Sequence, residues 1–289
     1  MNIERKEEYH MKLKLKQFIY IIVIAVFILI TVFPIFWALV SSLRSDEEIF
    51  RYAMPFSWRT FVPDKLTFQS YINIFVEKHF GKVLFNTIFV GVATIVTGII
   101  VNAVAGFIFA KYTFRFKRLL FFLVVLSFMV PFEAVSIPLY KMITVLKWEN
   151  TYIALILPTV ANGLVIFLFK QFFEQIAKEL VEAAELDGCG VWRMFVTIML
   201  PLSKPIISVV AIFAITAAWS DFLLPYLVLD LKKYKTIPIV IQYLKGGFNA
   251  VDWGTIVAML VLAIIPIIIF YGICQKYIIE GVVAGAVKG

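Results

Sequence analysis

Residues 83–110 read VLFNTIFVGVATIVTGIIVNAVAGFIFA, and no charged side chain interrupts them. A helix needs about 20 apolar residues to cross the ~30 Å hydrocarbon layer of a membrane, because it rises only about 1.5 Å per residue. This run exceeds that minimum length. We therefore predict a transmembrane helix over these residues.

Five further runs share this length and apolar character: 19–40, 119–140, 151–169, 205–229 and 254–275. Glu133 and Asp221 are the acids within them, and three of the runs hold no charged residue. The first run follows a basic N-terminus, but it is too long for the apolar part of a signal peptide and no A-x-A site follows it. We therefore predict an all-α membrane protein with six transmembrane helices, the first of them retained.

The composition supports a membrane protein and excludes several other classes. Of the 289 residues, 62% are hydrophobic and 16% are charged, whereas water-soluble domains are nearer half apolar. The net charge of +8 is typical of basic membrane loops, so a nucleic-acid-binding function is not predicted. The cysteines and histidines show no ligand spacing, so no metal site or Cys/His nucleophile is predicted: Cys189, Cys274, His10 and His79.

The distribution of basic residues predicts the orientation in the membrane. Lys and Arg in the N-terminal segment 1–18 and in the short loop 111–118 favour the cytoplasm for the side that holds both termini. The segments 41–82 and 230–253 then lie outside the cell. Residues 41–82 mix Pro, Trp and Phe with charge, which indicates a folded cap or a partner-facing loop.

On the predicted cytoplasmic side, the segment 170–204 is too long for a simple turn. It is also too rich in Ala, Glu and Leu to be disordered. Residues 171–186 have a helical pattern, with Glu174 and Lys178 at the favourable i,i+4 spacing. We expect one helix over this stretch.

A second short helix is predicted directly afterwards, over 191–199. Gly188 is the residue type that ends helices because it tolerates positive φ, and Pro205 prevents a smooth continuation into the next span. Together these features predict a helix–turn–helix elbow. The alternative interpretation is a surface hairpin that only connects two spans.

Within this elbow, the spacing EAA-x3-G-x9-I-x-LP resembles the EAA loop that marks permease subunits of ATP-binding cassette (ABC) importers. The matching positions are Glu182, Ala183, Ala184, Gly188, Ile198, Leu200 and Pro201, and Asp187 before the glycine also fits the loop. The resemblance extends over the chain, through 130–133 and 219–222 to the tail 276–289. It points to the carbohydrate-uptake group and to the smaller permease subunit of the maltose system. At Ser220 the family more often has Asn.

This resemblance implies a type I importer permease fold, with a single permease domain over 83–289 and a cytoplasmic EAA coupling-helix elbow. It also implies that the tail contacts the ATPase through Ala284, Gly285, Ala286, Val287, Lys288 and Gly289. The implied partners are a second homologous permease, an ATPase dimer and an extracytoplasmic sugar-binding protein, around a multi-pass chain in the prokaryotic plasma membrane.

No G-x-x-x-x-G-K-[ST] sequence occurs, so the chain is not expected to bind ATP phosphates itself. ATP-Mg²⁺ then belongs to the partner ATPase subunits, and we expect neither a cofactor nor an enzymatic activity in this chain.

Polar residues inside the predicted spans are the candidates for a translocation path: Glu133, Asn162, Trp219, Ser220 and Asp221. Intramembrane acids usually face a bundle interior or a water cavity. The alternative for Glu133 and Asp221 is a structural role beside Pro131 and Pro225. For Asn162 and Trp219 the alternatives are helix packing and the aromatic belt at the membrane interface.

Two other classes of function remain as alternatives. A stand-alone, ion-coupled secondary transporter would need repeated halves and coupling carboxylates deep in the membrane. An intramembrane enzyme would need a paired catalytic constellation, whereas Glu133 and Asp221 lie on different spans in unrelated contexts.

Overall fold

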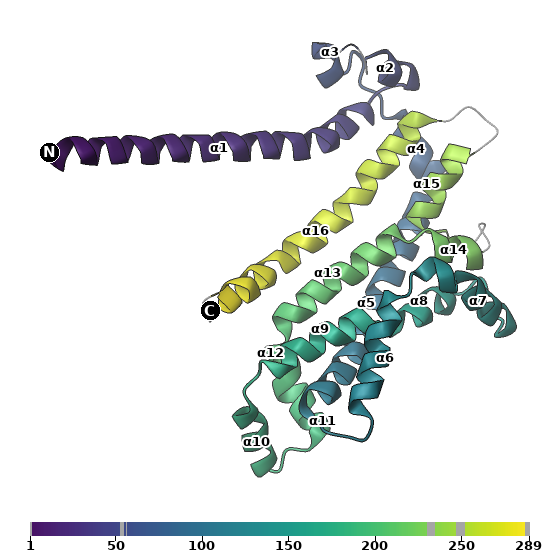
Figure 1. Cartoon of the computed structure of the whole chain (residues 1–289). Coiled ribbons are helices and arrows are strands. Elements are labelled where there is room, and N and C mark those ends of the chain that lie inside the picture. The colour runs from purple at the N-terminus through teal and green to yellow at the C-terminus, as the bar shows by residue number, and fades with distance from the viewer. Residues whose placement is uncertain (1, 53–54, 56, 230–234, 247–251, 287–289) are drawn as a thin grey trace. The chain divides into compact units, whose positions relative to one another are not determined.

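The computed structural model describes the backbone of residues 2–52, 55, 57–229, 235–246 and 252–286 (Figure 1). All the regular secondary structure in that part of the chain is helical. The chain divides into two compact units: Met1–Lys78 with Gly247–Leu262, and His79–Gly246 with Ala263–Gly289. The sequence predicted one permease domain over 83–289, so this division places part of the second outer segment with the N-terminal unit.

The first unit contains four N-terminal helices and the beginning of the last helix. They are α1 (Asn2–Ser41), α2 (Asp46–Arg51), α3 (Trp58–Phe61), α4 (Gln69–Val76) and the start of α16 (Trp253–Ala286). The side chains of residues 13–36 are all exposed, although most of them are apolar. Such a helix has no protein core to cover it, as expected for a segment that faces lipid.

Asp46 explains why the start of α16 belongs to the first unit. Its carboxylate accepts hydrogen bonds from the backbone nitrogens of Trp253 (3.0 Å) and Gly254 (2.8 Å), two N–H groups that the helix itself leaves free. The Phe50 ring also meets Trp253 edge-on at 5.7 Å. Two segments about 200 residues apart are therefore joined through the first turn of α16.

The second unit contains the remaining helices. They are α5 (Phe80–Lys111), α6 (Lys117–Met129), α7 (Phe132–Val145), α8 (Tyr152–Val160), α9 (Gly163–Glu174), α10 (Lys178–Leu186), α11 (Val191–Met194), the π-helical turn η1 (Phe195–Met199), α12 (Leu200–Leu202), α13 (Lys204–Ser220), α14 (Leu223–Val228), α15 (Ile237–Gly246) and the rest of α16. In Figure 1, α10 lies at one end of this unit, while α14 and α15 lie toward the other.

Helix α5 is packed between α9 and α13, and small residues allow this close approach. A side chain at Gly106 would place its Cβ 2.6 Å from the Cβ of Phe169 and 2.9 Å from the backbone nitrogen of Lys170. A Cβ at Gly91 would lie 2.5 Å from Ile215 on α13. Small residues at helix contacts are the usual means of packing helices closely in a membrane.

Three helices are long and apolar enough to cross a membrane: Leu13–Ser41, Phe80–Lys111 and Trp253–Tyr277. Three bent pairs of helices also pass this test, so the number rises to six if each pair is one span. The sequence predicted six continuous helices, and the structure differs at the bends.

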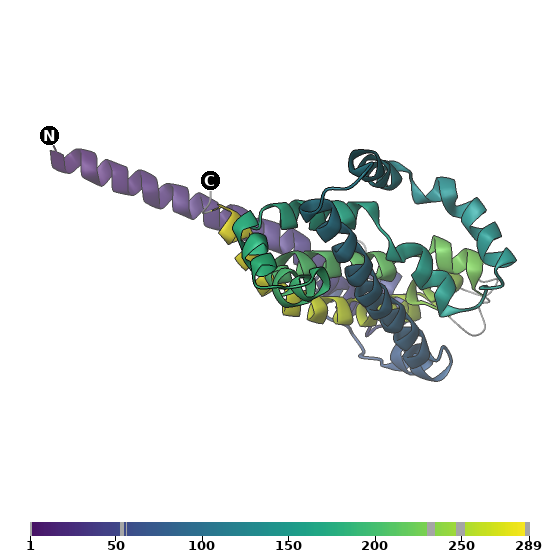
Figure 2. The same ribbon diagram turned by 90° about the horizontal axis from the view of Figure 1, so that it is seen from below.

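The sharpest of these bends separates α6 from α7 by 100°, a steep turn that Figure 1 and the view from below in Figure 2 both show. The expected helix over 119–140 is interrupted because Pro131 disfavours helical backbone at the residue before it, and Val130 has an extended conformation with ψ of 119°. With 13 residues, α6 is about 20 Å long, which is shorter than the ~30 Å hydrocarbon layer.

The two other predicted spans with breaks are 151–169 and 205–229. The first is interrupted between α8 and α9, which meet at 44°. The second is interrupted at Asp221 and Phe222, between α13 and α14. These two breaks border the same cavity.

Candidate functional site

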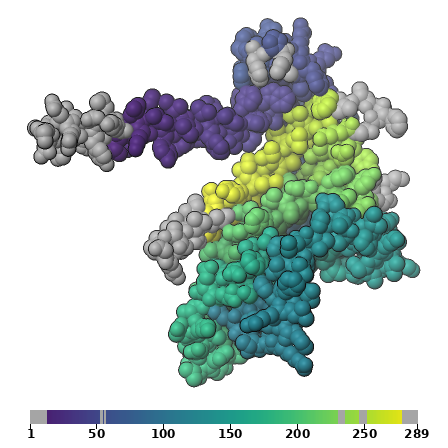
Figure 3. Space-filling view, in the orientation of Figure 1, coloured from purple at the N-terminus to yellow at the C-terminus, as the bar shows by residue number. Residues whose placement is uncertain are grey.

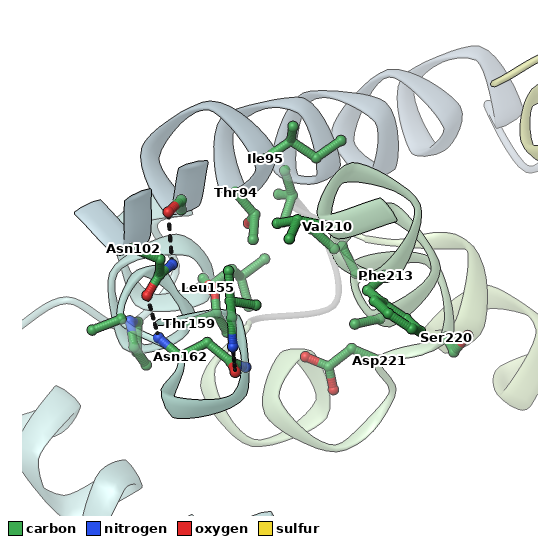
Figure 4. A pocket seen from close by; sticks show the side chains of 18 of the residues that line it. Thr94, Ile95, Asn102, Leu155, Thr159, Asn162, Val210, Phe213, Ser220 and Asp221 are labelled. Carbon is green, nitrogen blue, oxygen red and sulfur yellow. Dashed lines mark hydrogen bonds between the residues drawn. The ribbon is translucent and has the colours of Figure 1, made fainter. Parts of the chain in front are cut away.

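A cavity of about 610 Å³ lies within the second unit. Helices α5, α8, α9 and α13 supply most of its wall, and most of the lining side chains are apolar. Figure 4 shows polar side chains from opposite walls around the same space. The polar lining residues are Thr94, Asn102, Thr159, Asn162, Ser220, Asp221 and Thr236.

Asn102 holds the break between α8 and α9 together. It is buried, with 1% of its surface exposed, and its amide nitrogen donates to the carbonyl oxygens of Gly98 (2.6 Å) and Val160 (2.7 Å). Its amide oxygen accepts a hydrogen bond from the backbone nitrogen of Asn162 (2.9 Å). The amide nitrogen and the amide oxygen thus make three hydrogen bonds to backbone, and two of these satisfy groups that the interruption frees.

Asn162 begins the second half of the broken pair. Its side-chain oxygen accepts a hydrogen bond from the backbone nitrogen of Val165 at 3.2 Å, so it is the N-cap of α9. It also lines the cavity. The sequence leaves Asn162 either on the translocation path or in a helix-packing contact, and the structure adds a capping role.

Asp221 has a comparable position at the break between α13 and α14. One carboxylate oxygen accepts a hydrogen bond from the backbone nitrogen of Leu224 at 3.3 Å. Figure 4 shows its carboxylate directed toward the space between the helices. The neighbouring Ser220 also lines the cavity and donates its hydroxyl to the Thr216 carbonyl at 2.7 Å. Asp221 therefore combines a structural bond with a place in the cavity wall.

The two other predicted path residues lie elsewhere. Glu133 is exposed in the first turn of α7 and does not line the cavity. Trp219 is buried, with 7% of its surface exposed, and it does not line the cavity either. Its indole nitrogen has no hydrogen-bond partner within the described part of the chain. The structure thus brings together three of the five candidates.

The 170–204 segment differs from the predicted elbow at its start. Helix α9 ends at Glu174 and α10 begins at Lys178, so the expected helix over 171–186 is interrupted. Glu174 pairs with Lys170 at 2.8 Å, one turn earlier on α9, and not with Lys178 as the spacing predicted. The interruption is stabilised by Lys111, whose side-chain nitrogen donates to the carbonyl of Ile176 at 2.7 Å.

The EAA-like residues of this segment lie on α10 and in the turns after it. Glu182, Ala183 and Asp187 are exposed. Ala184 is buried in a cluster that contains Phe107, Phe173 and Phe195. Gly188 has φ of +73°, and no atom lies within 4 Å of the position that a Cβ would occupy there. In Figure 3, this segment forms a projecting tip of the second unit.

The remaining motif residues lie in the turns that lead into α13. Ile198 lies in η1, and Leu200 and Pro201 lie in α12. The helices 191–202 and 204–220 meet at 78°. The predicted helix over 191–199 appears as α11 followed by the π-helical turn.

An aromatic cluster connects the base of α10 to α5 and α9. Phe107 lies 6.0 Å from Phe173 and 5.4 Å from Phe195, measured between ring centroids. Tyr112 meets Phe107 edge-on at 5.5 Å, and its hydroxyl is buried without a partner among the described residues. Burial and the negative charge of Glu185 raise the pKa of the Tyr112 hydroxyl, so it remains a neutral donor.

The C-terminal tail is only partly described. Ala284, Gly285 and Ala286 continue the backbone of α16, and nothing is described of their side chains. Val287, Lys288 and Gly289 lie outside the described residues.

Sequence reasoning did not single out Asn102, Lys111 or Thr236. Asn102 is a polar residue within an otherwise apolar run, and that signal was present in the sequence. Lys111 is the first residue of the loop 111–118, and in the sequence its charge indicates only the orientation of that loop. Thr236 lies between predicted spans, and no sequence pattern connects it to the cavity.

Comparison with known families gives the class of this protein. Residues 102–283 match the family described as "Binding-protein-dependent transport system inner membrane component". The match covers more than half of the chain, so the chain belongs to this family of membrane-embedded transport components.

Individual relatives agree with that assignment. The chain is 32% identical over 261 residues to the arabinooligosaccharides transport system permease protein AraQ of Halalkalibacterium halodurans, covering 90% of this chain and 92% of that protein. It is 30% identical over 279 residues to the trehalose/maltose transport system permease protein MalG of Thermococcus litoralis, covering 95% and 98%. The resemblance to a maltose-type sugar permease is thereby confirmed.

A solved structure confirms the fold. A chain of a bacterial ABC transporter involved in the import of the acidic polysaccharide alginate superposes with a TM-score of 0.80 over 91% of this chain and 96% of that chain. The two sequences are 20% identical, so this likeness concerns the fold alone. The all-helical ABC permease fold expected from the sequence is therefore present.

Proposed function

We propose that this chain is a permease subunit of a binding-protein-dependent ABC importer that carries a di- or oligosaccharide into the cell. The observation that supports this most is the family membership over 102–283 together with relatives named for arabinooligosaccharides and trehalose/maltose. The cavity between α5, α8, α9 and α13 gives such a substrate a place to contact the chain.

Energy comes from separate ATPase subunits in this proposal, because the sequence has no phosphate-binding loop of its own. The chain then works as a non-enzymatic transport subunit, with a second homologous permease, an ATPase dimer and an extracytoplasmic sugar-binding protein as partners. Both termini and the 170–204 segment face the cytoplasm, which agrees with the basic loop 111–118.

The exposed residues of α10 and the open turn at Gly188 form the ATPase-docking surface in this proposal. Glu182 and Asp187 offer charge, while Ala183 and Gly188 permit close approach of a partner backbone. Beneath them, Ala184 packs on the aromatic cluster that joins α5, α9 and η1. Movement of α10 is thus passed to the helices that line the cavity, as a rigid-body displacement.

Purification of the tagged chain from its own membranes in mild detergent tests this function. We expect an ATPase subunit and a second permease to co-purify, and sugar uptake to require ATP. A stand-alone, ion-coupled transporter is the alternative. Transport by the purified chain alone, in liposomes without ATP, would establish that alternative and contradict the proposal.

A further inference from the structure

Among the described residues that line the cavity, Asp221 is the only one with an ionisable side chain. We infer that the cavity admits neutral polyhydroxyl ligands and excludes anionic ones, and that Asp221 sets this selectivity. The inference rests on the proposed function, because it specifies which class of carbohydrate the permease passes. It also separates this chain from the importer of an acidic polysaccharide whose fold it shares.

The first argument concerns charge. No Lys, Arg or His is among the described lining residues, and Asp221 forms no ion pair within the described part of the chain. Its carboxylate accepts a hydrogen bond from the Leu224 backbone nitrogen, and no cation neutralises it within the described part of the chain. An ionised carboxylate in an apolar wall repels an approaching anion more strongly than the same charge in water, because the surrounding medium screens it less.

The second argument concerns hydrogen bonding. The hydroxyl groups of Ser220 and Thr159 donate to the carbonyls of Thr216 (2.7 Å) and Ile156 (2.8 Å). Toward a ligand they therefore present lone pairs, as the Asp221 carboxylate does. Sugar hydroxyls carry hydrogens that can bond to such acceptors. Carboxylate, sulfate and dianionic phosphate groups carry only acceptors, so this part of the wall offers them nothing.

Thr236 adds a further polar group to the cavity wall. Its side chain lines the cavity with 3% of its surface exposed, and its hydroxyl has no hydrogen-bond partner among the described residues. Buried polar groups in folded proteins almost always have a partner, either protein or water. A hydroxyl can donate or accept, so a neutral ligand hydroxyl or a water satisfies Thr236 equally well.

Cysteine reactivity measures this selectivity without a known substrate. Cys189→Ser with Cys274→Ser removes the two free thiols, and Ser220→Cys then places a reporter beside Asp221. The reporter is treated with a neutral hydroxyethyl, a cationic trimethylammonium-ethyl and an anionic sulfonatoethyl methanethiosulfonate. Each rate is divided by the rate with a small thiol in solution. We expect the cationic reagent to react at least about tenfold faster than the anionic one, from the attraction and repulsion of a single charge.

Asp221→Asn keeps the size of the side chain but removes its charge. Adding it should reduce the ratio of the cationic to the anionic reaction rate at Ser220→Cys at least fivefold. The matched control is Thr197→Cys, an exposed hydroxyl position on η1 that does not line the cavity. There Asp221→Asn should leave the ratio unchanged. The inference is overturned if Asp221→Asn has no effect at Ser220→Cys, if the anionic reagent reacts faster there, or if the neutral reagent does not react at all.

ATP-dependent sugar uptake and co-purification of an ATPase are measured in the same membranes. Absence of both with the unsubstituted chain contradicts the proposed function, whereas the labelling ratio still reports the charge of the cavity. Normal uptake with no charge selectivity at Ser220→Cys overturns this inference alone. The two failures are therefore distinguishable.

Discussion

The side-chain nitrogen of Lys111, at the end of α5, donates a hydrogen bond of 2.7 Å to the backbone carbonyl of Ile176. Ile176 lies in the interruption between α9 and α10, where carbonyl groups have no partner within a helix. Lys111 therefore fixes the point from which α10 departs.

Replacing Lys111 by Met should loosen this departure point. Hydrogen bonds to charged groups contribute about 1.5–3 kcal/mol, so we expect faster proteolysis at 175–177 and weaker coupling of ATP hydrolysis to uptake. Lys111→Arg keeps the charge and a donor, and should restore most of both. Lys178→Met, at an exposed lysine of α10, is the matched control. Equal proteolysis of the Lys111 and Lys178 variants would show that the bond is unimportant.

Variants at Gly188 test the proposed ATPase-docking surface. Gly188→Asp adds a charged side chain at a turn with φ of +73°, and we expect uptake to be abolished while membrane insertion stays normal. Gly188→Asn tolerates positive φ and should retain part of the uptake. Gly81→Asp, at a position that is equally open but lies at the start of α5, should transport normally. Normal uptake by Gly188→Asp would mean that the segment is only a connector.

Asn102→Leu should lower the stability of the protein, although leucine is an apolar residue that suits a membrane helix. The change leaves the Val160 carbonyl and the Asn162 nitrogen without their partner, at about 1–3 kcal/mol for each buried group. We expect a lower melting temperature of the purified complex. Asn162→Ser keeps an N-cap for α9 and should change stability by less than about 0.5 kcal/mol. Equal melting temperatures for Asn102→Leu and the parent would contradict this role.

Asp46→Ala should weaken the link between the outer segment and α16. Losing an N-cap acceptor typically destabilises by about 1 kcal/mol, and Asp46→Asn should recover part of that. Gly254→Ala tests the same contact from the other side, because its Cβ would lie 2.6 Å from the Ser70 hydroxyl and 2.9 Å from Asp46. Gly272→Ala meets no atom within 4 Å and is the control. Thermal unfolding of all four variants measures the effects.

The tail prediction follows from the family resemblance. Removing residues 284–289 should reduce substrate-stimulated ATP hydrolysis in the assembled complex more than it reduces assembly. Replacing the same six residues by Gly and Ser keeps the length and should give the same loss if the sequence itself makes the contact. Unchanged stimulation in both variants would remove this role from the tail.

The existence of the helices was predictable, whereas their interruptions were less so. A long apolar run indicates that its side chains are buried in lipid or protein. It does not indicate where the helix ends, because the residues on both sides of a break are equally apolar. Pro131 was a visible reason for a break between α6 and α7. The break at Asn162 depends on Asn102, 60 residues earlier, and such a long-range bond has no local pattern.

The candidate site was predictable only as a set of polar residues. Composition selected Glu133 and Asp221 equally, since each is a single acid within a predicted span. The bend after α6 carries Glu133 to an exposed position, while the break after α13 leaves Asp221 beside the cavity. Deciding between them requires the direction of each helix segment, which depends on the other helices that it packs against.

Asn162 and Asp221 each stand where one helix stops and another begins, on two walls of one cavity. A change of angle at either position would move its side chain relative to the opposite wall, and at Asn162 the bonds from Asn102 to Val160 and Asn162 would oppose it. Such a change would alter the width of the cavity and its chemistry together. Any mutation that stiffens these two joints should slow the transport cycle even where every ligand contact is kept.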